Sequence, residues 1–268
     1  MREFRFCIKY IFNRYEFYVA LFVSLFIGGF HAVYTVQANQ VLPDAGFSGD
    51  YLFILFNIFQ NVYSFLILIL PIALGLILSD SNWQEKYRGT ETMLAVRLNR
   101  KKLIISRFIM SIIMSFVVAI SGLLLNYLIL RGCYGGGYRM TYNQEMPFAI
   151  RGVSRLYLNK LMITEPAKAV LYASLMFSLE MGMLSGFSYA ASFYISRRFR
   201  LAIYLMPLIL LIFSELLANL FHAQSWSLIQ LLQVFSVYFR PDSYTVLMLF
   251  LFCLSVLLLV RPLQKRDI

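Results

Sequence analysis

The stretch FIMSIIMSFVVAISGLLLNYLIL, residues 108–130, contains no charged side chain. The hydrocarbon core of a bilayer is about 30 Å thick, and a helix needs about 20 mostly apolar residues to cross it. Further stretches of similar length and composition are found at 17–36, 51–78, 168–195, 201–220 and 244–260. We therefore predict an all-α, polytopic membrane protein with six transmembrane helices.

The composition of the whole chain agrees with this prediction. Hydrophobic residues make up 60% of the 268 residues and charged residues 14%, and the mean hydropathy is +0.71. This leaves too little polar surface to cover a water-soluble globule of this length. No long Pro/Gly/Ser linker, charge run or internal repeat divides the chain, so residues 1–268 are predicted to form a single transmembrane domain.

The distribution of positive charge predicts the orientation of these spans. With six spans, 17 of the 24 lysines and arginines fall on one side, in the N-terminus, the loop 79–107, the turn at 197–200 and the C-terminal tail. Positive residues near the ends of spans favour the cytoplasmic side. Both termini are therefore expected in the cytoplasm of a bacterial cell with the chain in its inner membrane, and the loop 131–167 is expected outside.

The N-terminus is not predicted to be a cleaved signal peptide, because the apolar run after it is too long and lacks a small-residue cleavage site. Phe4, Ile8, Ile11 and Phe12 recur at helical spacing, and the positive residues lie largely off this stripe. Residues 1–14 are therefore predicted to form an amphipathic helix in the inner interface of the membrane. A simple extension of the first span is the alternative.

Signals for catalysis or metal binding are few. The chain has two histidines and three cysteines, with no spacing typical of a metal site. The glycine-rich residues 132–137 lack the Lys-Ser/Thr pair of a phosphate-binding loop. We predict no catalytic residue, no bound metal and no cofactor in this chain. The net charge of +11 is attributed to the orientation rule and to anionic lipids, not to nucleic-acid binding.

The loop 79–107 carries the most specific local pattern. Ser81 and Gln84 have the spacing of a capping box, which predicts that a short helix begins there. Asn99 is well placed to cap the third span, which opens with three positive residues. The loop is therefore expected to present short helical segments to the cytosol.

The sequence EKYRGTETML at 85–94, followed by Arg100 and Arg107, resembles the loop after the second span in type-2 ATP-binding cassette (ABC) transporter permeases. The C-terminal residues 264–268 and the six-span layout are also similar to that family. Two departures are Leu98, where the family often has proline, and a longer loop at 131–167.

The resemblance implies that the loop 79–107 couples the chain to a separate cytoplasmic ATPase subunit, which would hold the ATP and Mg. The working unit would contain a second copy or a paralogue of the permease. The residues that would form or support the contact with the ATPase are Glu85, Arg88, Gly89, Thr90, Glu91 and Leu94. The alternative is a positively charged anchor that only obeys the orientation rule.

Polar residues inside the predicted spans are candidates for a translocation path, because unsatisfied polar groups in hydrocarbon are costly and usually face other helices or a cavity. Asn57, Gln60, Asn61 and Ser64 share one face of the second span, which hydrogen bonding between helices explains as readily as a path. The other candidates are Glu180 in the fourth span and, toward the outer leaflet, Glu215 and Asn219 in the fifth.

A second pattern in the fourth span predicts helix packing. Small residues recur there every four positions and include Ser178, Gly182 and Gly186. Such a seam lets two helix backbones approach closely. Thr164, Glu165 and Pro166 resemble the start signal of this helix. Residues 221–243 mix aromatic, aliphatic and polar side chains, as expected of a re-entrant or interface segment on the outer side.

The resemblance implies a permease subunit that exports a peptide, a lipid or another amphipathic substrate, with energy supplied by its ATPase partners and with membrane lipids around it. Two alternatives from other classes are an integral-membrane enzyme that modifies lipids and a non-transporting assembly or receptor protein. The enzyme is disfavoured because no His/Asp/Glu cluster lies at a predicted membrane boundary.

Overall fold

The computed structural model describes residues 2–40, 48–50, 52–53, 61–89, 98–136, 161, 164–196, 199–234 and 238–264, and this part of the chain is helical, without a β-strand. The longer helices are α2 (Tyr15–Gln40), α4 (Asn61–Gly75), α7 (Arg100–Tyr134), α10 (Pro166–Ala191), α11 (Arg200–Leu220) and α13 (Pro241–Gln264). The shorter ones are α1 (Arg2–Phe12), α5 (Ser81–Arg88), η3 (Gln224–Trp226) and α12 (Leu228–Leu232). The all-α prediction is confirmed.

Five of these helices are long and apolar enough to cross a membrane: α2, α7, α10, α11 and α13. They coincide with five of the six predicted spans, and α7 is the longest at 35 residues. The predicted second span at 51–78 is described only in part, because residues 51 and 54–60 lie outside the described residues. Its described part contains α4, which has 15 residues. These features are those of a multi-pass membrane protein.

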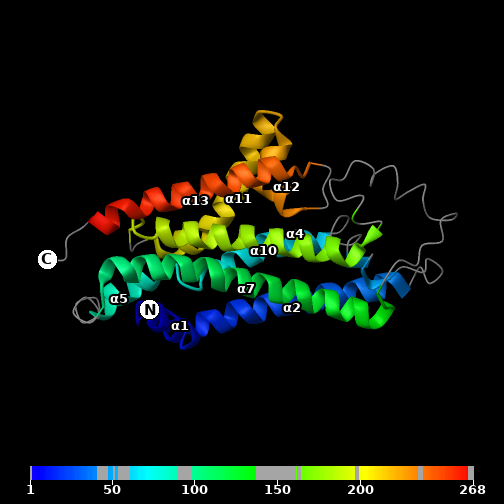
Figure 1. Ribbon diagram of the computed structural model, residues 1–268, viewed down its shortest axis with the longest axis horizontal. Helices are drawn as coiled ribbons and strands as arrows, with labels where there is room; N and C mark the ends of the chain where they lie inside the picture. The colour runs from blue at the N-terminus through cyan, green and yellow to red at the C-terminus, as the bar shows by residue number, and fades with distance from the viewer. Residues whose placement is uncertain are drawn as a thin grey trace.

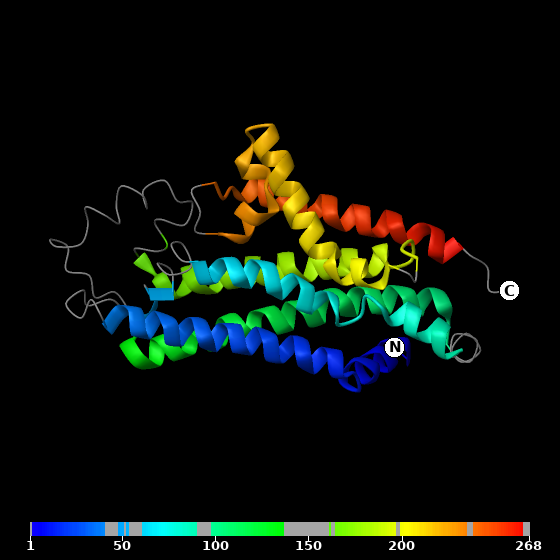
Figure 2. The same ribbon diagram turned by 180° about the vertical axis from the view of Figure 1, so that it is seen from behind.

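The helices α2, α7, α10 and α13 run along the long axis of the molecule in a row, with α7 between α2 and α10 (Figure 1). Seen from behind, α11 crosses this row at a steep angle and rises away from it (Figure 2). The helices α1 and α5 and the last turn of α13 lie at one end of the bundle, which we call the α5 end (Figure 1).

The closest backbone contact joins α2 to α7. A Cβ atom on Gly28 would lie 2.1 Å from the carbonyl oxygen of Gly122, and a Cβ on Gly122 would lie 2.4 Å from that of Ser24. The Ser24 hydroxyl donates to the carbonyl of Val118 over 2.7 Å. Because neither glycine has a side chain, the two backbones touch, as is common between membrane helices.

The start signals predicted for two spans are confirmed. The Asn99 side chain accepts a hydrogen bond from the backbone N–H of Lys102 over 3.1 Å, which caps α7. Proline 166 occupies the first turn of α10. Both residues suit a helix start, because an asparagine oxygen satisfies a free N–H and proline has no N–H to satisfy.

The short helix predicted at Ser81 is present, but the capping box predicted for it is wrong. The Ser81 hydroxyl is buried and has no hydrogen-bond partner. The Gln84 side chain donates instead to Asp80 and Glu16. Burial of this helix start among charged side chains replaces the predicted cap with bonds to Asp80, just before the helix, and to Glu16 of α2.

The helix predicted near the N-terminus is also present as α1, and it contacts α7. The apolar residues of its predicted stripe are partly buried against the bundle and partly exposed. Ile11 is fully buried, together with Cys7 on the same side, whereas Phe4 and Phe12 are 39% and 47% exposed. One side of α1 therefore packs on the bundle, and apolar side chains remain exposed on the rest of its surface.

Large apolar side chains cover much of the outer surface, as expected for helices in contact with lipid. On α2 the rings of Phe22, Phe26 and Phe30 stack in a row with centroids 6.0 and 6.2 Å apart, and each ring is more than half exposed. On α11 the exposed residues include Leu201, Leu216 and Leu220.

Candidate functional site

Charged side chains gather inside the protein at the α5 end. Arg14 lies in the break between α1 and α2 and is 6% exposed. Its Nη2 donates to Asp80 Oδ1 over 2.6 Å and lies 2.9 Å from Glu16 Oε1, while its Nε donates to Glu16 Oε2 over 3.2 Å. Arg14, Glu16, Asp80, Gln84 and Tyr204 form what we call the Arg14 cluster.

Gln84 and Tyr204 complete the Arg14 cluster from α5 and α11. Gln84 Nε2 donates to Glu16 Oε1 over 3.1 Å and to Asp80 Oδ2 over 2.9 Å. The Tyr204 hydroxyl donates to the same Asp80 oxygen over 2.7 Å. Although burial by itself disfavours the charged form of Arg14, the bonds to Glu16 and Asp80 outweigh this effect and raise its pKa. Arg14 is therefore charged at every physiological pH.

A second ion pair, between Glu85 and Arg107, links α5 to α7. The Arg107 guanidinium bonds both carboxylate oxygens of Glu85, with Nη1 to Oε2 at 2.8 Å and Nη2 to Oε1. Arg107 is 2% exposed and Glu85 8% exposed. Such bidentate pairs fix the relative orientation of the two elements as well as their distance.

Tyr10 of α1 joins the two groups. The Cζ atoms of Arg14 and Arg107 each lie 5.5 Å from the centroid of its ring, within the range of cation–π attraction. Burial raises the pKa of the Tyr10 hydroxyl, and burial also raises the pKa of the nearby Cys7 thiol to about 11. Both groups are therefore neutral at physiological pH.

The helix α5 is also bonded to the segment that follows α10. Trp83 Nε1 donates to the backbone carbonyl of Ser192 over 3.1 Å, and Asn82 Nδ2 donates to its hydroxyl over 3.4 Å. Short α5 and the residue before it therefore hold polar contacts with the starts of α2, α7 and α11 and with the end of α10.

Only some of the residues predicted to couple the chain to an ATPase are among the described residues, and these lie at the α5 end. Glu85 faces inward, onto Arg107, and is not an exposed contact. Gly89 ends α5 at a φ of +67° with open space around its Cα. Arg88 belongs to α5, but its side chain lies outside the described residues, as do Thr90, Glu91 and Leu94 altogether. Tyr87 is the large exposed side chain of α5, at 72%.

Of the polar residues predicted for a path, Glu180, Glu215 and Asn219 have described side chains. Asn57 and Gln60 lie outside the described residues, as do the side chains of Asn61 and Ser64 on α4. Glu180 on α10 is fully buried, and neither carboxylate oxygen has a hydrogen-bond partner. Among the candidates whose side chains are described, Glu180 is not bonded to Glu215 or Asn219.

Glu215 and Asn219, the remaining candidates for the path, lie together on α11. Asn219 Nδ2 donates to Glu215 Oε1 over 3.4 Å. Ser227, just before α12, donates to the other Glu215 oxygen, and Gln224 donates to Asn219. These bonds fasten the segment 224–232 to the end of α11.

The small residues predicted for packing face α7. A Cβ on Gly182 would lie 2.8 Å from the carbonyl oxygen of Ile112, and one on Gly186 would lie 2.7 Å from the Ile112 side chain. Ser178 is buried on α10 without a partner for its hydroxyl. The close approach of Gly28 and Gly122 was not predicted, although Ser24, Gly28 and Ala32 show the same spacing of four in the sequence.

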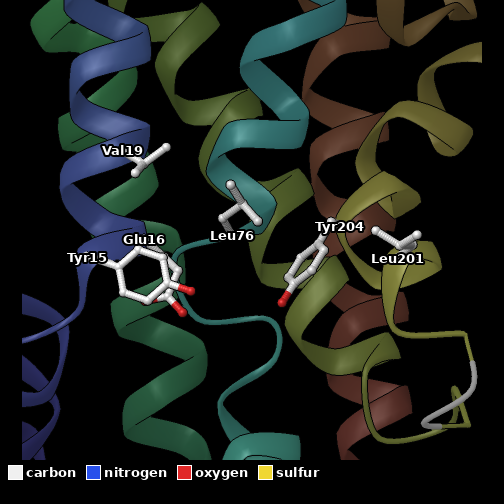
Figure 3. Close-up of a pocket in the computed structure, with 6 residues that line it drawn as sticks. All are labelled: Tyr15, Glu16, Val19, Leu76, Leu201 and Tyr204. Carbon is white, nitrogen blue, oxygen red and sulfur yellow. The ribbon is translucent and has the colours of Figure 1, made fainter.

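A pocket of about 300 Å³ lies beside the Arg14 cluster. It opens between α2 and α11, with the end of α4 between them (Figure 3). Its lining residues are Tyr15, Glu16, Val19, Leu76, Leu201 and Tyr204. Sequence patterns did not predict this site, because its lining comes from three separate segments, with three residues from α2, one after α4 and two from α11.

Comparison with protein-family models, with curated proteins and with solved structures finds no match to this chain.

Proposed function

We propose that this chain is the membrane-spanning permease subunit of an ATP-driven transporter of the type-2 ABC kind. In this proposal it crosses a bacterial inner membrane six times, with α4 in the second span and both termini in the cytoplasm. The helix α1 lies at the inner interface, and two such subunits work with two cytoplasmic ATPases. The chain moves a peptide, a lipid or another amphipathic substrate and performs no bond chemistry itself.

The observation that carries the proposal is the set of buried contacts made by α5 and the residue before it. Asp80 bonds Arg14 and Tyr204, Glu85 bonds Arg107, and Trp83 bonds the segment after α10. A force applied to α5 from the cytoplasm would therefore reach four long helices through bonds that are costly to break. A positively charged anchor in a flexible loop has no need of such contacts.

The rigidity of these contacts follows from their burial. Removing one partner of a buried ion pair typically costs about 3–5 kcal/mol, because the other charge is left uncompensated. Exposed ion pairs contribute about 1 kcal/mol or less. Since Arg14, Glu16, Asp80, Glu85 and Arg107 are all less than a tenth exposed, α5 moves together with the helix ends that it touches.

The proposed orientation has a direct test at a native residue. Cys133 is exposed near the end of α7 that lies away from α5, and Tyr87 is exposed on α5. We expect a membrane-impermeant maleimide to label Cys133 in intact cells. In a Cys133→Ser background, Tyr87→Cys should be labelled only in inverted vesicles. Labelling of position 87 from outside intact cells would contradict the topology.

The proposed coupling is tested through the exposed surface of α5, because Glu85 is buried. Tyr87→Glu changes a side chain that is 72% exposed, and Tyr238→Glu is the matched control, at 50% exposure on the connection before α13. We expect Tyr87→Glu to lower co-purification with the proposed partner ATPase by about tenfold, and Tyr238→Glu to leave it unchanged. Equal retention of the ATPase by both variants would refute the docking assignment.

A further inference from the structure

In the proposed topology, the pocket between α2, α4 and α11 lies at the level where a bilayer changes from headgroups to hydrocarbon. Tyr15 and Glu16 open α2, Leu201 is the second residue of α11, and Leu76 follows the end of α4. Since these helices are the proposed spans, the pocket sits where they enter the membrane. Its volume of about 300 Å³ is at the lower end for small-molecule sites, which span about 300–1,000 Å³.

The outer edge of the pocket is apolar and open. Leu201 and Val19 are 74% and 45% exposed, and Tyr15 is 74% exposed. In a membrane these side chains are in contact with lipid, so a ligand chain can leave the pocket into hydrocarbon without crossing a polar barrier. A ligand that fits both this edge and the interior must be amphipathic.

Two polar groups of the pocket, on Glu16 and Tyr204, are hydrogen-bond acceptors toward a ligand. Glu16 is 6% exposed and presents a carboxylate, which in its ionised form has no proton to donate. The proton of the Tyr204 hydroxyl is directed to Asp80, so toward the pocket this oxygen is an acceptor. Arg14 reaches both carboxylates but is not one of the lining residues. An anionic ligand would meet these oxygens, and the Tyr15 hydroxyl is the lining side chain that can donate to it.

Two aromatic rings complete the arrangement. Tyr15 stands beside Glu16 on one side of the pocket, and Tyr204 stands on the other side, with Leu76 between them (Figure 3). Tyrosine faces attract cations, and aromatic side chains next to a carboxylate are a common way to hold alkylammonium groups. The pocket therefore favours a cation over a neutral or anionic head.

We propose that this pocket binds the ammonium head of an amphiphile between Tyr15, Glu16 and Tyr204, with the apolar chain lying along Val19 and Leu201 in the bilayer. The claim that this ammonium amphiphile is the transported substrate rests on the proposed function. The claim that it binds here rests on the pocket alone. The ammonium group has two sources, an aminophospholipid of the membrane or a cationic compound that enters from the inner leaflet.

The test uses the full chain in maltoside micelles and three probes that share one fluorescent body: trimethylammonium-diphenylhexatriene, its uncharged parent and its propionate. Trp83 of α5 is the energy donor, in a Trp226→Phe background. We expect saturable energy transfer to the ammonium probe, and transfer to the uncharged and anionic probes only at the level of partition into micelles. Equal transfer to the ammonium and uncharged probes would overturn the proposal.

Four variants locate the site. Glu16→Gln should weaken binding of the ammonium probe by about tenfold or more, as expected for the loss of a charge-assisted contact, and the exposed Glu165→Gln should not. Val19→Phe should fill the pocket without replacing any residue of the Arg14 cluster, and Val33→Phe, on the exposed surface of the same helix, is its control. Identical binding by the two valine variants would also overturn the proposal, even where Glu16→Gln fails to fold.

Competition identifies the source of the ammonium group. Displacement of the probe by phosphatidylethanolamine, but not by phosphatidylglycerol, would assign the site to a membrane lipid; displacement by dodecylamine alone would assign it to an added amine. Stimulation of the partner ATPase is measured separately. If the ammonium probe binds but does not stimulate the ATPase, the binding site is supported and the proposed transport function is contradicted. If other compounds stimulate the ATPase and the ammonium probe does not bind, only the binding site is refuted.

Discussion

The ion pair between Glu85 and Arg107 gives a quantitative prediction. Replacing either residue leaves the other charge buried, at 8% and 2% exposure, without its bidentate partner. We expect Glu85→Leu and Arg107→Met each to lower the free energy of unfolding by about 3–5 kcal/mol. The double variant leaves no stranded charge, and buried pairs replaced by apolar residues are often neutral. The free energy of unfolding of the double variant should therefore fall by no more than that of either single variant.

Unfolding by SDS in mixed maltoside micelles measures these losses, with the fluorescence of Trp83 as the probe, since its indole N–H is bonded to Ser192 in the folded state. The exposed pair of Glu165 and Lys168 is the control, with side chains 48% and 70% exposed. Its removal should cost about 1 kcal/mol or less. If the losses of the two buried single variants simply add in the double variant, the pair is not coupled and the proposed rigidity of α5 is wrong.

Three further predictions concern packing, capping and pH. Gly122→Leu should prevent α2 from packing on α7, because even a Cβ atom there would lie 2.4 Å from a backbone oxygen. Increased proteolysis of α2 would show this loss. Gly132→Leu is the control and should have no effect, because Gly132 faces open space. Asn99→Ala should cost about 1 kcal/mol in the same SDS titration, because the cap to Lys102 is lost. Burial raises the folded-state pKa of Cys7 from 9.0 to about 11. The contribution of its protonated thiol to the free energy of unfolding is therefore complete below about pH 9 and is lost as the pH rises toward 11. The stability of the wild type should therefore fall over this range more steeply than that of Cys7→Ala.

Much of the fold was predictable because the membrane imposes a simple rule on the sequence. Predominantly apolar runs of about 20 residues located five helices that are long enough to cross it, and the cap at Asn99 and the proline at 166 located two helix starts. These signals are local: each depends on residues within one helix or one turn.

The capping box at Ser81 shows where local signals fail. Its spacing is correct for a cap, yet the Gln84 side chain bonds Asp80 just before the helix and Glu16 of α2, because the helix start is buried. The role of Arg107 was equally hidden, since in the sequence it is one of several positive residues near the end of a span. A buried ion pair between residues 22 positions apart has no periodic pattern that would reveal it.

The sequence by itself determined that this is a membrane protein, that it is helical, and roughly where most of its long helices end. The reason is that the length and composition of an apolar run decide whether a helix suits a bilayer. Only the tertiary structure decided which polar residues meet. It brought Arg14, Glu16, Asp80 and Tyr204 together from three separate segments and placed a pocket beside them. Such a meeting depends on how helices pack, where burial makes each unpaired charge costly, and not on the spacing of residues along one helix.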